Sequence, residues 1–286
     1  MQIWEAIVLG LVEGITEYLP VSSTGHLILT SAWLGLDTPE QKSAVDAFNI
    51  VIQGGAIAAV AGLYWTRIMQ MLRGLTGSDL VGRRLLLNLI VAFVPAALLG
   101  PLLDDTIETH LFRPVPVLAA LFLGGVWMIW LDRRSSRGAG PLHGLDDMKW
   151  QQALVIGLFQ CVAMWPGTSR SMVTIAGGSM LGLRPREAAE FSFLLGLPTL
   201  GGACVYKLLQ NLRDSARDGT PNLFESLGFT AVIVGFVVAA IAAAFAVRWL
   251  VSFLSRHGLG PFGWYRIALC IVLAAWIASG TLQIQP

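Results

Sequence analysis

Charged side chains are scarce in this sequence of 286 residues. Asp, Glu, Lys and Arg make up 13% of it, whereas soluble domains average about 25%, and the mean hydropathy is +0.67. This composition excludes an ordinary water-soluble domain and indicates an integral membrane protein. The formal net charge is only +1, so we expect no nucleic-acid partner.

Cysteine is also rare, and no basic segment precedes the first apolar run. The three cysteines lie inside apolar stretches, which argues against a disulfide framework and indicates small buried side chains. The first apolar run opens with Glu5 and is interrupted by Glu13 and Glu17. We therefore do not expect a cleaved signal peptide.

Long apolar stretches, by contrast, are plentiful. A membrane-spanning helix needs about 20 mostly apolar residues, with ~17 as a lower limit. Six stretches qualify, at roughly 50–66, 85–103, 114–131, 188–207, 228–250 and 262–283. The sequence predicts an all-α integral membrane protein with six transmembrane helices in a single membrane domain, residues 1–286.

Two further apolar regions, 2–34 and 152–183, are interrupted by proline and hydroxyl side chains. The interruptions read "YLPVSSTGH" and "MWPGTSRS". Because proline removes a helical hydrogen-bond donor and clashes with the preceding turn, each region should form two short helices joined at a break. Such a pair need not cross the bilayer, so we predict two re-entrant regions.

The distribution of Lys and Arg predicts the orientation in the membrane. If the six stretches cross and the two broken regions do not, twelve of these residues fall on one side and five on the other. By the positive-inside bias the richer side is cytoplasmic. Both termini then face outward, and the two broken regions enter the membrane from opposite sides.

The two broken regions also resemble each other. "GLVEGITEYLPVSS" from Gly10 aligns with "GLFQCVAMWPGTS" from Gly157 if Leu19 is an extra residue in the first. A weaker echo relates "FVPAALLG" near Pro95 to "GLPTLGGA" near Pro198. Together with the charge distribution, these matches predict an inverted-topology repeat with halves 1–131 and 132–286. In such repeats broken helices bring polar groups to the membrane midplane, so we expect the two hydroxyl clusters to face each other.

The first broken region carries two acids on one helix face. Glu13 and Glu17 are four residues apart and are therefore neighbours on a helix. An ionised acid at the centre of a membrane helix costs ~2.5 to 3.5 kcal/mol, so a cationic partner is expected. The alternative interpretation is that both side chains lie near the interface and reach water.

Hydroxyl groups and a histidine follow the first proline. Ser22, Ser23 and Thr24 begin the next short helix, whose free N–H groups and dipole favour an anion, although the same residues are also ordinary helix caps. His26 lies one turn further on. A hydroxyl beside an imidazole is a common way to activate a nucleophile, so we favour a catalytic role over a hydrogen-bonded structural histidine.

The second break contributes Thr168, Ser169, Arg170 and Ser171, with Thr174 one turn after the arginine. A guanidinium between apolar helices needs an anion that can accept two hydrogen bonds, and phosphate is a good match. Glu13 or Glu17 is the alternative partner for Arg170.

A divalent cation is the expected cofactor. Two carboxylates, Arg170 and a protonated His26 leave the site nearly neutral, so a phosphorylated ligand would make it strongly negative without a metal ion. Carboxylate and phosphate oxygens are hard ligands, and the sequence offers no Cys or multiple-His cluster. Mg²⁺ or Ca²⁺ is therefore predicted.

The two polar motifs resemble those of a known family. "EGITEYLPVSSTGHLIL" and "PGTSRS" are similar to the two signatures of the bacterial undecaprenyl-pyrophosphate phosphatases, the bacitracin-resistance family. The resemblance extends through "FNIVIQGGAIAAV", "LDDMKWQQALVIGLFQ" and "FSFLLGLP". It implies hydrolysis of undecaprenyl diphosphate to the monophosphate carrier lipid of cell-wall synthesis. It also implies bacitracin resistance and a location in the bacterial inner membrane, with a site open to the periplasm.

The resemblance also implies roles for individual residues. It implies catalytic roles for Glu17, Ser23, His26 and Arg170 and metal binding by Glu13 and Glu17. Apart from the resemblance, we expect phosphate binding by the residues that follow the two breaks, namely Ser22, Thr24, Ser169, Arg170, Ser171 and Thr174. Two departures from the family pattern stand out. Met172 and Val173 occupy positions where Gly and Ala are usual, and Asn49 replaces a common acid. The first departure puts in doubt how closely that helix approaches the substrate.

Several points stay open at the level of sequence. They are the choice between Ser22 and Ser23 as nucleophile, covalent against direct water attack, Mg²⁺ against Ca²⁺, and the oligomeric state, with a homodimer as one candidate. A transporter or flippase of a phosphorylated solute or prenyl carrier lipid is the alternative class, because inverted repeats with broken helices are also found in transporters. A histidine beside a hydroxyl favours chemistry over transport.

Overall fold

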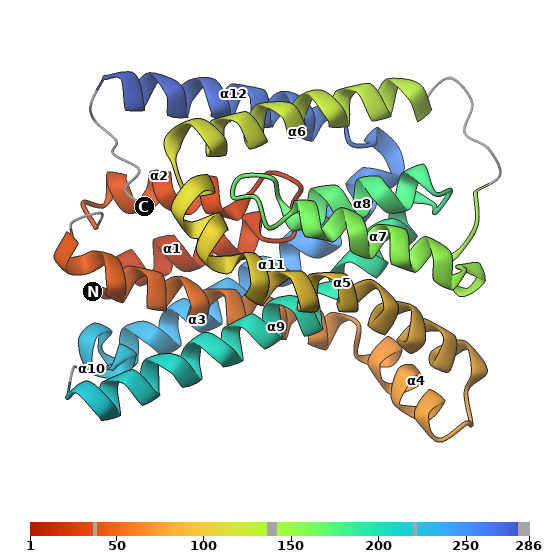
Figure 1. The fold of residues 1–286 in the computed structure, drawn as a ribbon, viewed down its shortest axis with the longest axis horizontal. Coiled ribbons are helices and arrows are strands. Elements are labelled where there is room, and N and C mark those ends of the chain that lie inside the picture. Colours follow the sequence, from red (N-terminus) through yellow and green to blue (C-terminus); the bar gives the residue numbers. More distant parts are fainter. Residues whose placement is uncertain (37–38, 136–141, 220–221, 280–286) are drawn as a thin grey trace. The chain divides into compact units, whose positions relative to one another are not determined.

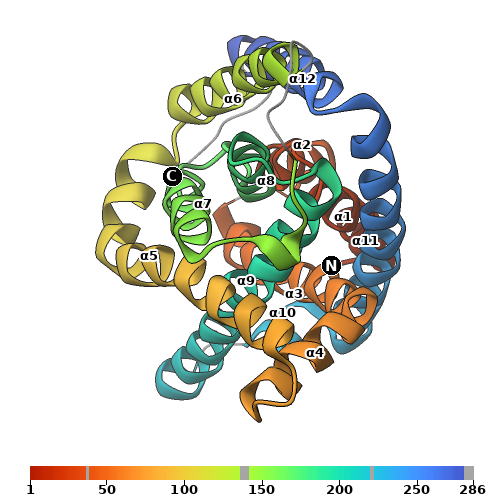
Figure 2. The same cartoon turned by 90° about the vertical axis from the view of Figure 1, so that its right-hand side faces the viewer.

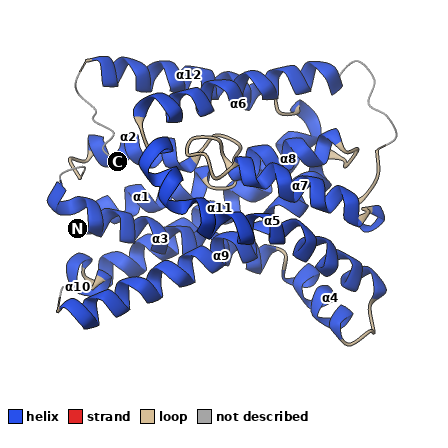
Figure 3. Ribbon diagram, in the orientation of Figure 1, coloured by secondary structure: helices blue, strands red, loops and turns tan. Residues whose placement is uncertain are grey.

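The structure is a computed structural model that describes residues 1–36, 39–135, 142–219 and 222–279. Within these ranges the chain is built from helices without a β-strand (Figure 3), and a single isolated bridge pairs His143 with Leu183. The elements in order are α1 (Ile3–Thr16), α2 (Ser23–Trp33), α3 (Pro39–Leu63), α4 (Trp65–Leu75), α5 (Leu80–Leu111), α6 (Pro114–Ser135), η1 (Leu145–Asp147), α7 (Trp150–Val162), α8 (Arg170–Met180), α9 (Pro185–Asp218), α10 (Leu223–Leu227), α11 (Phe229–His257) and α12 (Gly260–Ala278).

Six of these helices are long and apolar enough to cross a membrane. The qualifying segments are Val45–Leu63, Leu80–Leu103, Pro114–Arg134, Pro185–Arg217, Phe229–His257 and Gly260–Ala278. Each contains or overlaps one of the six stretches predicted from the sequence, so this prediction is confirmed. The protein is an all-α integral membrane protein.

The two proline-containing regions are broken helices, as predicted. The first region forms α1 and α2, and the second forms α7 and α8. All four helices are shorter than a membrane span. Their re-entrant path through the bilayer and their entry from opposite sides stay predictions.

The order of helices repeats along the chain, with α1 to α6 followed by α7 to α12 (Figure 1). Three boundaries of the broken helices recur 147 positions apart: Ile3 and Trp150, Ser23 and Arg170, and Trp33 and Met180. The first helix of each half also begins in the same way. The Gln2 N–H donates to Glu5 Oε2 over 2.7 Å, and the Lys149 N–H donates to Gln152 Oε1 over 2.9 Å.

The backbone of the two breaks corrects the alignment made from sequence. Ser22 has φ of 72° and Ser169 has φ of 73°, and no other non-glycine residue in the described ranges has a positive φ. Each serine directly precedes the second helix of its region. The two serines are therefore equivalent without a gap, and treating Leu19 as an extra residue was wrong. The sequence alignment matched Pro20 with Pro166. When Ser22 is instead matched with Ser169, the two prolines are offset by one position.

The weaker sequence echo does not follow the repeat. Pro95 lies inside α5 and Pro198 lies inside α9. By helix order the counterpart of α5 is α11, whereas α9 is the counterpart of α3. This match was wrong, because short apolar segments with one proline resemble each other by composition alone.

The chain forms two compact units, which do not follow the halves of the sequence. The first contains Met1–Tyr18, Ser23–Leu63 and Gly196–Val247, and the second contains Leu19–Ser22, Tyr64–Leu195 and Arg248–Pro286. In the first unit, Leu9, Phe48 and Ile52 belong to one buried apolar cluster with residues of α10 and α11. Gly10 of α1 lies against the backbone of α11, where a Cβ atom would be 2.7 Å from the Gly235 carbonyl oxygen.

The second unit uses the same kind of close helix approach. Gly157 of α7 lies against α5, where a Cβ atom would be 2.4 Å from the Ala92 carbonyl oxygen. Helices α6 and α12 run side by side (Figures 1 and 2), with Gly125 against the carbonyl of Gly263. Small residues permit this contact between helix backbones, as is common in membrane proteins.

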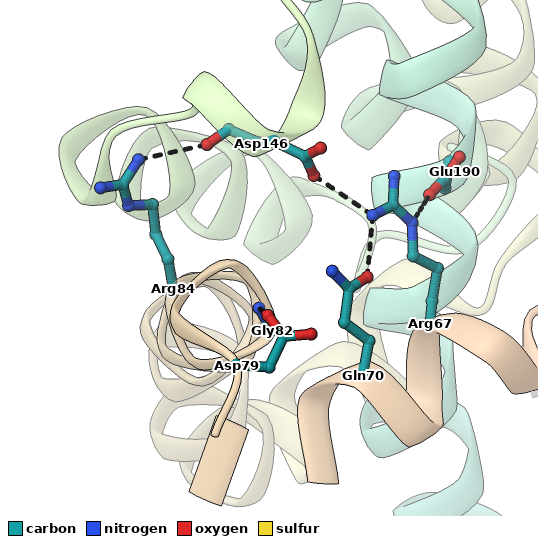
Figure 4. A network of polar contacts seen from close by, with 7 residues as sticks. All are labelled: Arg67, Gln70, Asp79, Gly82, Arg84, Asp146 and Glu190. Carbon is teal, nitrogen blue, oxygen red and sulfur yellow. Dashed lines mark hydrogen bonds and ion pairs between the residues drawn. The ribbon is translucent and has the colours of Figure 1, made fainter. Parts of the chain in front are cut away.

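An ion-pair network ties three elements of the second unit together (Figure 4). Arg67 on α4 donates to Glu190 on α9 over 2.7 Å and to Asp146 in η1 over 3.2 Å. It also donates to Gln70 over 3.0 Å. Partial burial acts to lower the pKa of Arg67, but the two carboxylates more than offset it, and the pKa lies above its ordinary value. The guanidinium therefore stays charged, and the network fixes α4 and η1 onto α9.

Candidate active site

The two acids of the first unit are buried. The Glu13 side chain belongs to α1 and Glu17 follows the last turn of that helix, and the residues are 1% and 8% exposed. The interpretation that both reach water is therefore contradicted. The two residues are one helical turn apart, with Glu17 continuing the helical backbone of α1, so their carboxyl groups are neighbours on one face. Two ionised carboxylates so close repel, so this arrangement needs a proton or a cation to hold them together.

The Ser23 hydroxyl is bonded to one of these acids. It donates to Glu17 Oε2 over 2.7 Å, from the first residue of α2 to the end of α1. A carboxylate at this distance can accept the serine proton, so the structure adds Glu17 to His26 as a candidate general base. His26 is half-buried on the first turn of α2.

The break itself, Leu19–Ser22, belongs to the second unit. There the Ser171 hydroxyl of α8 donates to the Leu19 carbonyl over 3.0 Å. Ser22 is 3% exposed and holds the left-handed backbone conformation from which α2 starts. That conformation costs an L-residue ~1 to 2 kcal/mol, and such strain is often found where function requires a particular backbone.

The second break starts α8 in the same way. The Ser169 hydroxyl caps the helix by accepting from the Met172 N–H over 3.3 Å. Arg170 is the first residue of α8, and its Nη1 donates to the Ser192 carbonyl over 2.9 Å. The guanidinium is thus held at a helix N-terminus, where free N–H groups and the dipole favour an anion.

Ser171 and Thr174 are buried in the first turns of α8, next to Arg170. They are 0% and 1% exposed. The Thr174 hydroxyl donates to the Arg170 carbonyl over 2.8 Å and lies 2.7 Å from the Ser192 hydroxyl. The direct phosphate contacts predicted for Ser171 and Thr174 stay predictions, as does the contact predicted for Thr24, which is half-buried.

Arg266 fixes the loop before α8. This fully buried arginine of α12 donates from Nη2 to the carbonyls of Ala120 and Gly167 over 2.9 and 2.8 Å, and from Nε to Leu121 over 3.3 Å. Gly124 makes room for it, because a Cβ atom there would be 2.6 Å from Arg266 Nη2. The side chain of Met172 fills the neighbouring space, with its methyl group 2.9 Å from the same Cβ position.

Sequence reasoning missed two residues that position the second break, Ser192 and Arg266. Both carry polar groups inside segments apolar enough to span a membrane, and both are 0% exposed. A polar residue inside a membrane helix is by itself a signal of function or of a specific polar partner. The sequence cannot name the partner, because Arg266 contacts a loop about a hundred residues earlier.

A divalent cation fits the first unit's acids. The described residues contain no group of three or more His, Cys, Asp or Glu that could hold a metal ion on its own. Glu13 Oε2, however, is buried and has no hydrogen-bond partner within the described ranges. Mg²⁺ is commonly bound by one or two carboxylates together with substrate phosphates, so two acids and the Ser23 hydroxyl are a suitable donor set.

The chain is a helical membrane protein with two broken-helix regions. The first region presents two acids and a hydroxyl. The second region presents an arginine at a helix N-terminus. The family described as bacitracin resistance protein BacA matches residues 6–272. The chain belongs to this family.

Relatives with curated names cover nearly the whole chain. The chain is 46% identical to an undecaprenyl-diphosphatase of Sorangium cellulosum over 278 residues, covering 96% of this chain and 86% of that protein. It is 44% identical to an undecaprenyl-diphosphatase of Acidovorax ebreus, covering 95% and 94%. It is 45% identical to undecaprenyl-diphosphatase 2 of Rhodospirillum rubrum, covering 98% and 96%.

Proposed function

We propose that this protein hydrolyses undecaprenyl diphosphate to undecaprenyl phosphate and inorganic phosphate. The observation that carries the proposal is the hydrogen bond from Ser23 to Glu17, beside the buried carboxyl group of Glu13. The names of the relatives, which this chain matches over nearly its full length, supply the substrate.

In this reaction the terminal phosphorus is attacked by an oxygen, and the anhydride P–O bond breaks to release the lipid monophosphate. Ser23 is the proposed attacking group, because its hydroxyl already donates to a carboxylate. Water then hydrolyses the phosphoserine to release inorganic phosphate; in the alternative, Ser23 orients a water molecule that attacks the phosphorus directly. Glu17 accepts the proton, and His26, three residues after Ser23, is the second proton carrier. Ser22 is less suited, because its strained backbone serves to start α2.

Arg170 is proposed to stabilise the charge of the phosphoryl group. Its planar guanidinium suits two phosphate oxygens, and the contact with the Ser192 carbonyl holds it at the start of α8. Ser169 and Thr168 present a helix cap and a buried hydroxyl next to it. Glu13 and Glu17 would hold Mg²⁺ or Ca²⁺, which would supply Lewis-acid stabilisation of the phosphate oxygens.

Phosphate release in detergent tests the proposal. The purified chain should release phosphate from undecaprenyl diphosphate, and Ser23→Ala should release far less while Ser22→Ala keeps most activity. Transport cannot occur in detergent micelles, so activity there separates an enzyme from a transporter. A wild-type protein that binds the lipid but releases no phosphate would contradict the proposal.

We also propose that the protein lies in the bacterial inner membrane, with its site open to the periplasm. The support is the excess of Lys and Arg on one predicted side. A cysteine at Ser78, in the exposed turn between α4 and α5, should resist an impermeant thiol reagent in intact cells. A cysteine at Thr109, near the exposed end of α5, should react. The reverse labelling would overturn this orientation.

A further inference from the structure

A groove opens in the second unit where α5 and α7 begin. Its volume is about 610 Å³, and it is lined by the first turns of both helices and by the end of η1. None of its lining residues belongs to the candidate active site. The groove is within the usual range for small-molecule sites, roughly 300 to 1,000 Å³, and needs its own explanation.

Positive charge dominates the groove. Arg83, Arg84 and Lys149 line it together with a single acid, Asp147. The three cationic residues are exposed, and none of them takes part in an ion pair within the described ranges. Arg84 is oriented by a hydrogen bond from its Nη1 to the Asp146 carbonyl over 3.2 Å (Figure 4). The groove is therefore suited to an anion.

The rest of the lining is apolar and exposed. Leu80, Leu87 and Trp150 are 69%, 53% and 57% exposed. Leu80 is also the first residue of a segment that is apolar enough to span the membrane. Tryptophan is typical of the membrane–water interface, where its ring lies at the level of the lipid headgroups. Inorganic phosphate would leave this wall uncovered, whereas an amphiphile would cover it.

We propose that this groove binds the phosphodiester headgroup of an anionic phospholipid. Arg83, Arg84 and Lys149 surround the phosphate, and Trp150 and Leu87 contact the glycerol and the first acyl carbons. Basic pockets at the ends of membrane helices are a recurring way to recognise anionic lipids. The proposal does not depend on the proposed hydrolysis, because it concerns residues and a readout separate from the active site.

Lipid binding to the full-length protein in neutral detergent tests the proposal. Phosphatidylglycerol and phosphatidylcholine are titrated separately, and the bound lipid is counted by native mass spectrometry. The groove variant combines Arg83→Gln, Arg84→Gln and Lys149→Gln. The control variant combines Arg133→Gln, Arg248→Gln and Arg256→Gln, which removes the same charge from exposed positions on α6 and α11.

The wild-type and control proteins should prefer phosphatidylglycerol, and the groove variant should bind it on the order of 100-fold more weakly, since each of the three cations contributes about fivefold. Equal losses in both variants, or no preference between the lipids in the wild type, would overturn the proposal. Displacement of the lipid by millimolar inorganic phosphate would also overturn it in favour of a free-anion site. If the triple variant does not fold, the double variant Arg83→Gln and Lys149→Gln replaces it. This variant keeps the Arg84 hydrogen bond, and its binding of the two lipids is compared with the control in the same way.

Discussion

The first and second breaks have similar backbone conformations but carry different side chains. At each break a serine with φ near 72° starts the second helix, and the first helix begins with an equivalent cap. The gap-free register then pairs Glu13 with Gln160, Glu17 with Met164 and Ser23 with Arg170. Every acid of the first break therefore has a neutral counterpart in the second, and the arginine of the second replaces the serine of the first.

This difference supports the proposal that the two breaks share a backbone arrangement and divide the chemistry between them. The first copy presents acids and a hydroxyl, which suit proton transfer and a divalent cation. The second presents a guanidinium at a helix N-terminus, which suits an anion. A substitution should therefore have very different effects at two equivalent positions.

Arg170→Lys, which keeps the positive charge at this position, should cause a large loss of turnover. An ammonium cannot reproduce the planar two-pronged contact with phosphate, so turnover should fall by ~10² to 10³, while the melting temperature stays within a few degrees. Phosphate release and thermal unfolding in detergent measure both quantities. Near-normal turnover by Arg170→Lys, combined with a destabilised Arg170→Ala, would assign Arg170 a structural role.

Glu13→Gln should lower turnover at least ~10²-fold and raise the divalent-cation concentration needed for half-maximal activity. The reason is the loss of a charged oxygen ligand without a change of shape. Glu5→Gln is the matched control, because it lies on the same helix and glutamine can still accept from the Gln2 N–H at the cap. An unchanged cation titration in Glu13→Gln would remove Glu13 from the metal-binding residues.

Arg266→Met should have a smaller effect, and it should lower both the stability of the fold and the turnover. It leaves the buried Gly167 carbonyl without its donor, which costs ~1 to 3 kcal/mol of unfolding free energy. We expect about a tenfold loss of turnover, because the loop that positions Arg170 loosens. Arg266→Lys retains a donor and should recover most of the activity, in contrast to Arg170→Lys. If neither Arg266 variant changes the melting temperature, Arg266 does not fix the loop.

Substitutions at the two left-handed serines should have the smallest effects and should match each other. Ser22→Gly and Ser169→Gly should leave the melting temperature nearly unchanged, because glycine accepts a positive φ and serves as an acceptable cap. Ser22→Val and Ser169→Val should each destabilise the protein by ~1 to 2 kcal/mol. Opposite behaviour at the two positions would contradict the shared backbone.

Much of the fold could be predicted from the sequence, because membrane helices are long apolar runs and proline marks where they break. The six spans and both broken regions follow from these two properties. The register of the repeat could not be predicted. It is defined by the positive φ angles of Ser22 and Ser169, whereas the positions of the prolines suggest an alignment that differs by one residue.

The residue types of the candidate site stand out in the sequence, but the contacts between them do not. Unusual acids, hydroxyls and an arginine in apolar surroundings indicated Glu13, Glu17, Ser23 and Arg170. The bond from Ser23 to Glu17 depends on how the loop between them folds back. The support from Arg266 depends on helix packing between distant parts of the chain, which local sequence does not encode.

Phosphate release by Glu17→Gln and Met164→Gln tests the central claim most directly, because the two positions are equivalent in the repeat and each variant carries the same amide. The division of chemistry between the breaks predicts that Glu17→Gln loses ~10² to 10⁴ of the rate with undecaprenyl diphosphate in detergent. Met164→Gln should stay within a few-fold of the wild type. Comparable rates for the two variants, either both active or both inactive with intact melting transitions, would contradict the claim.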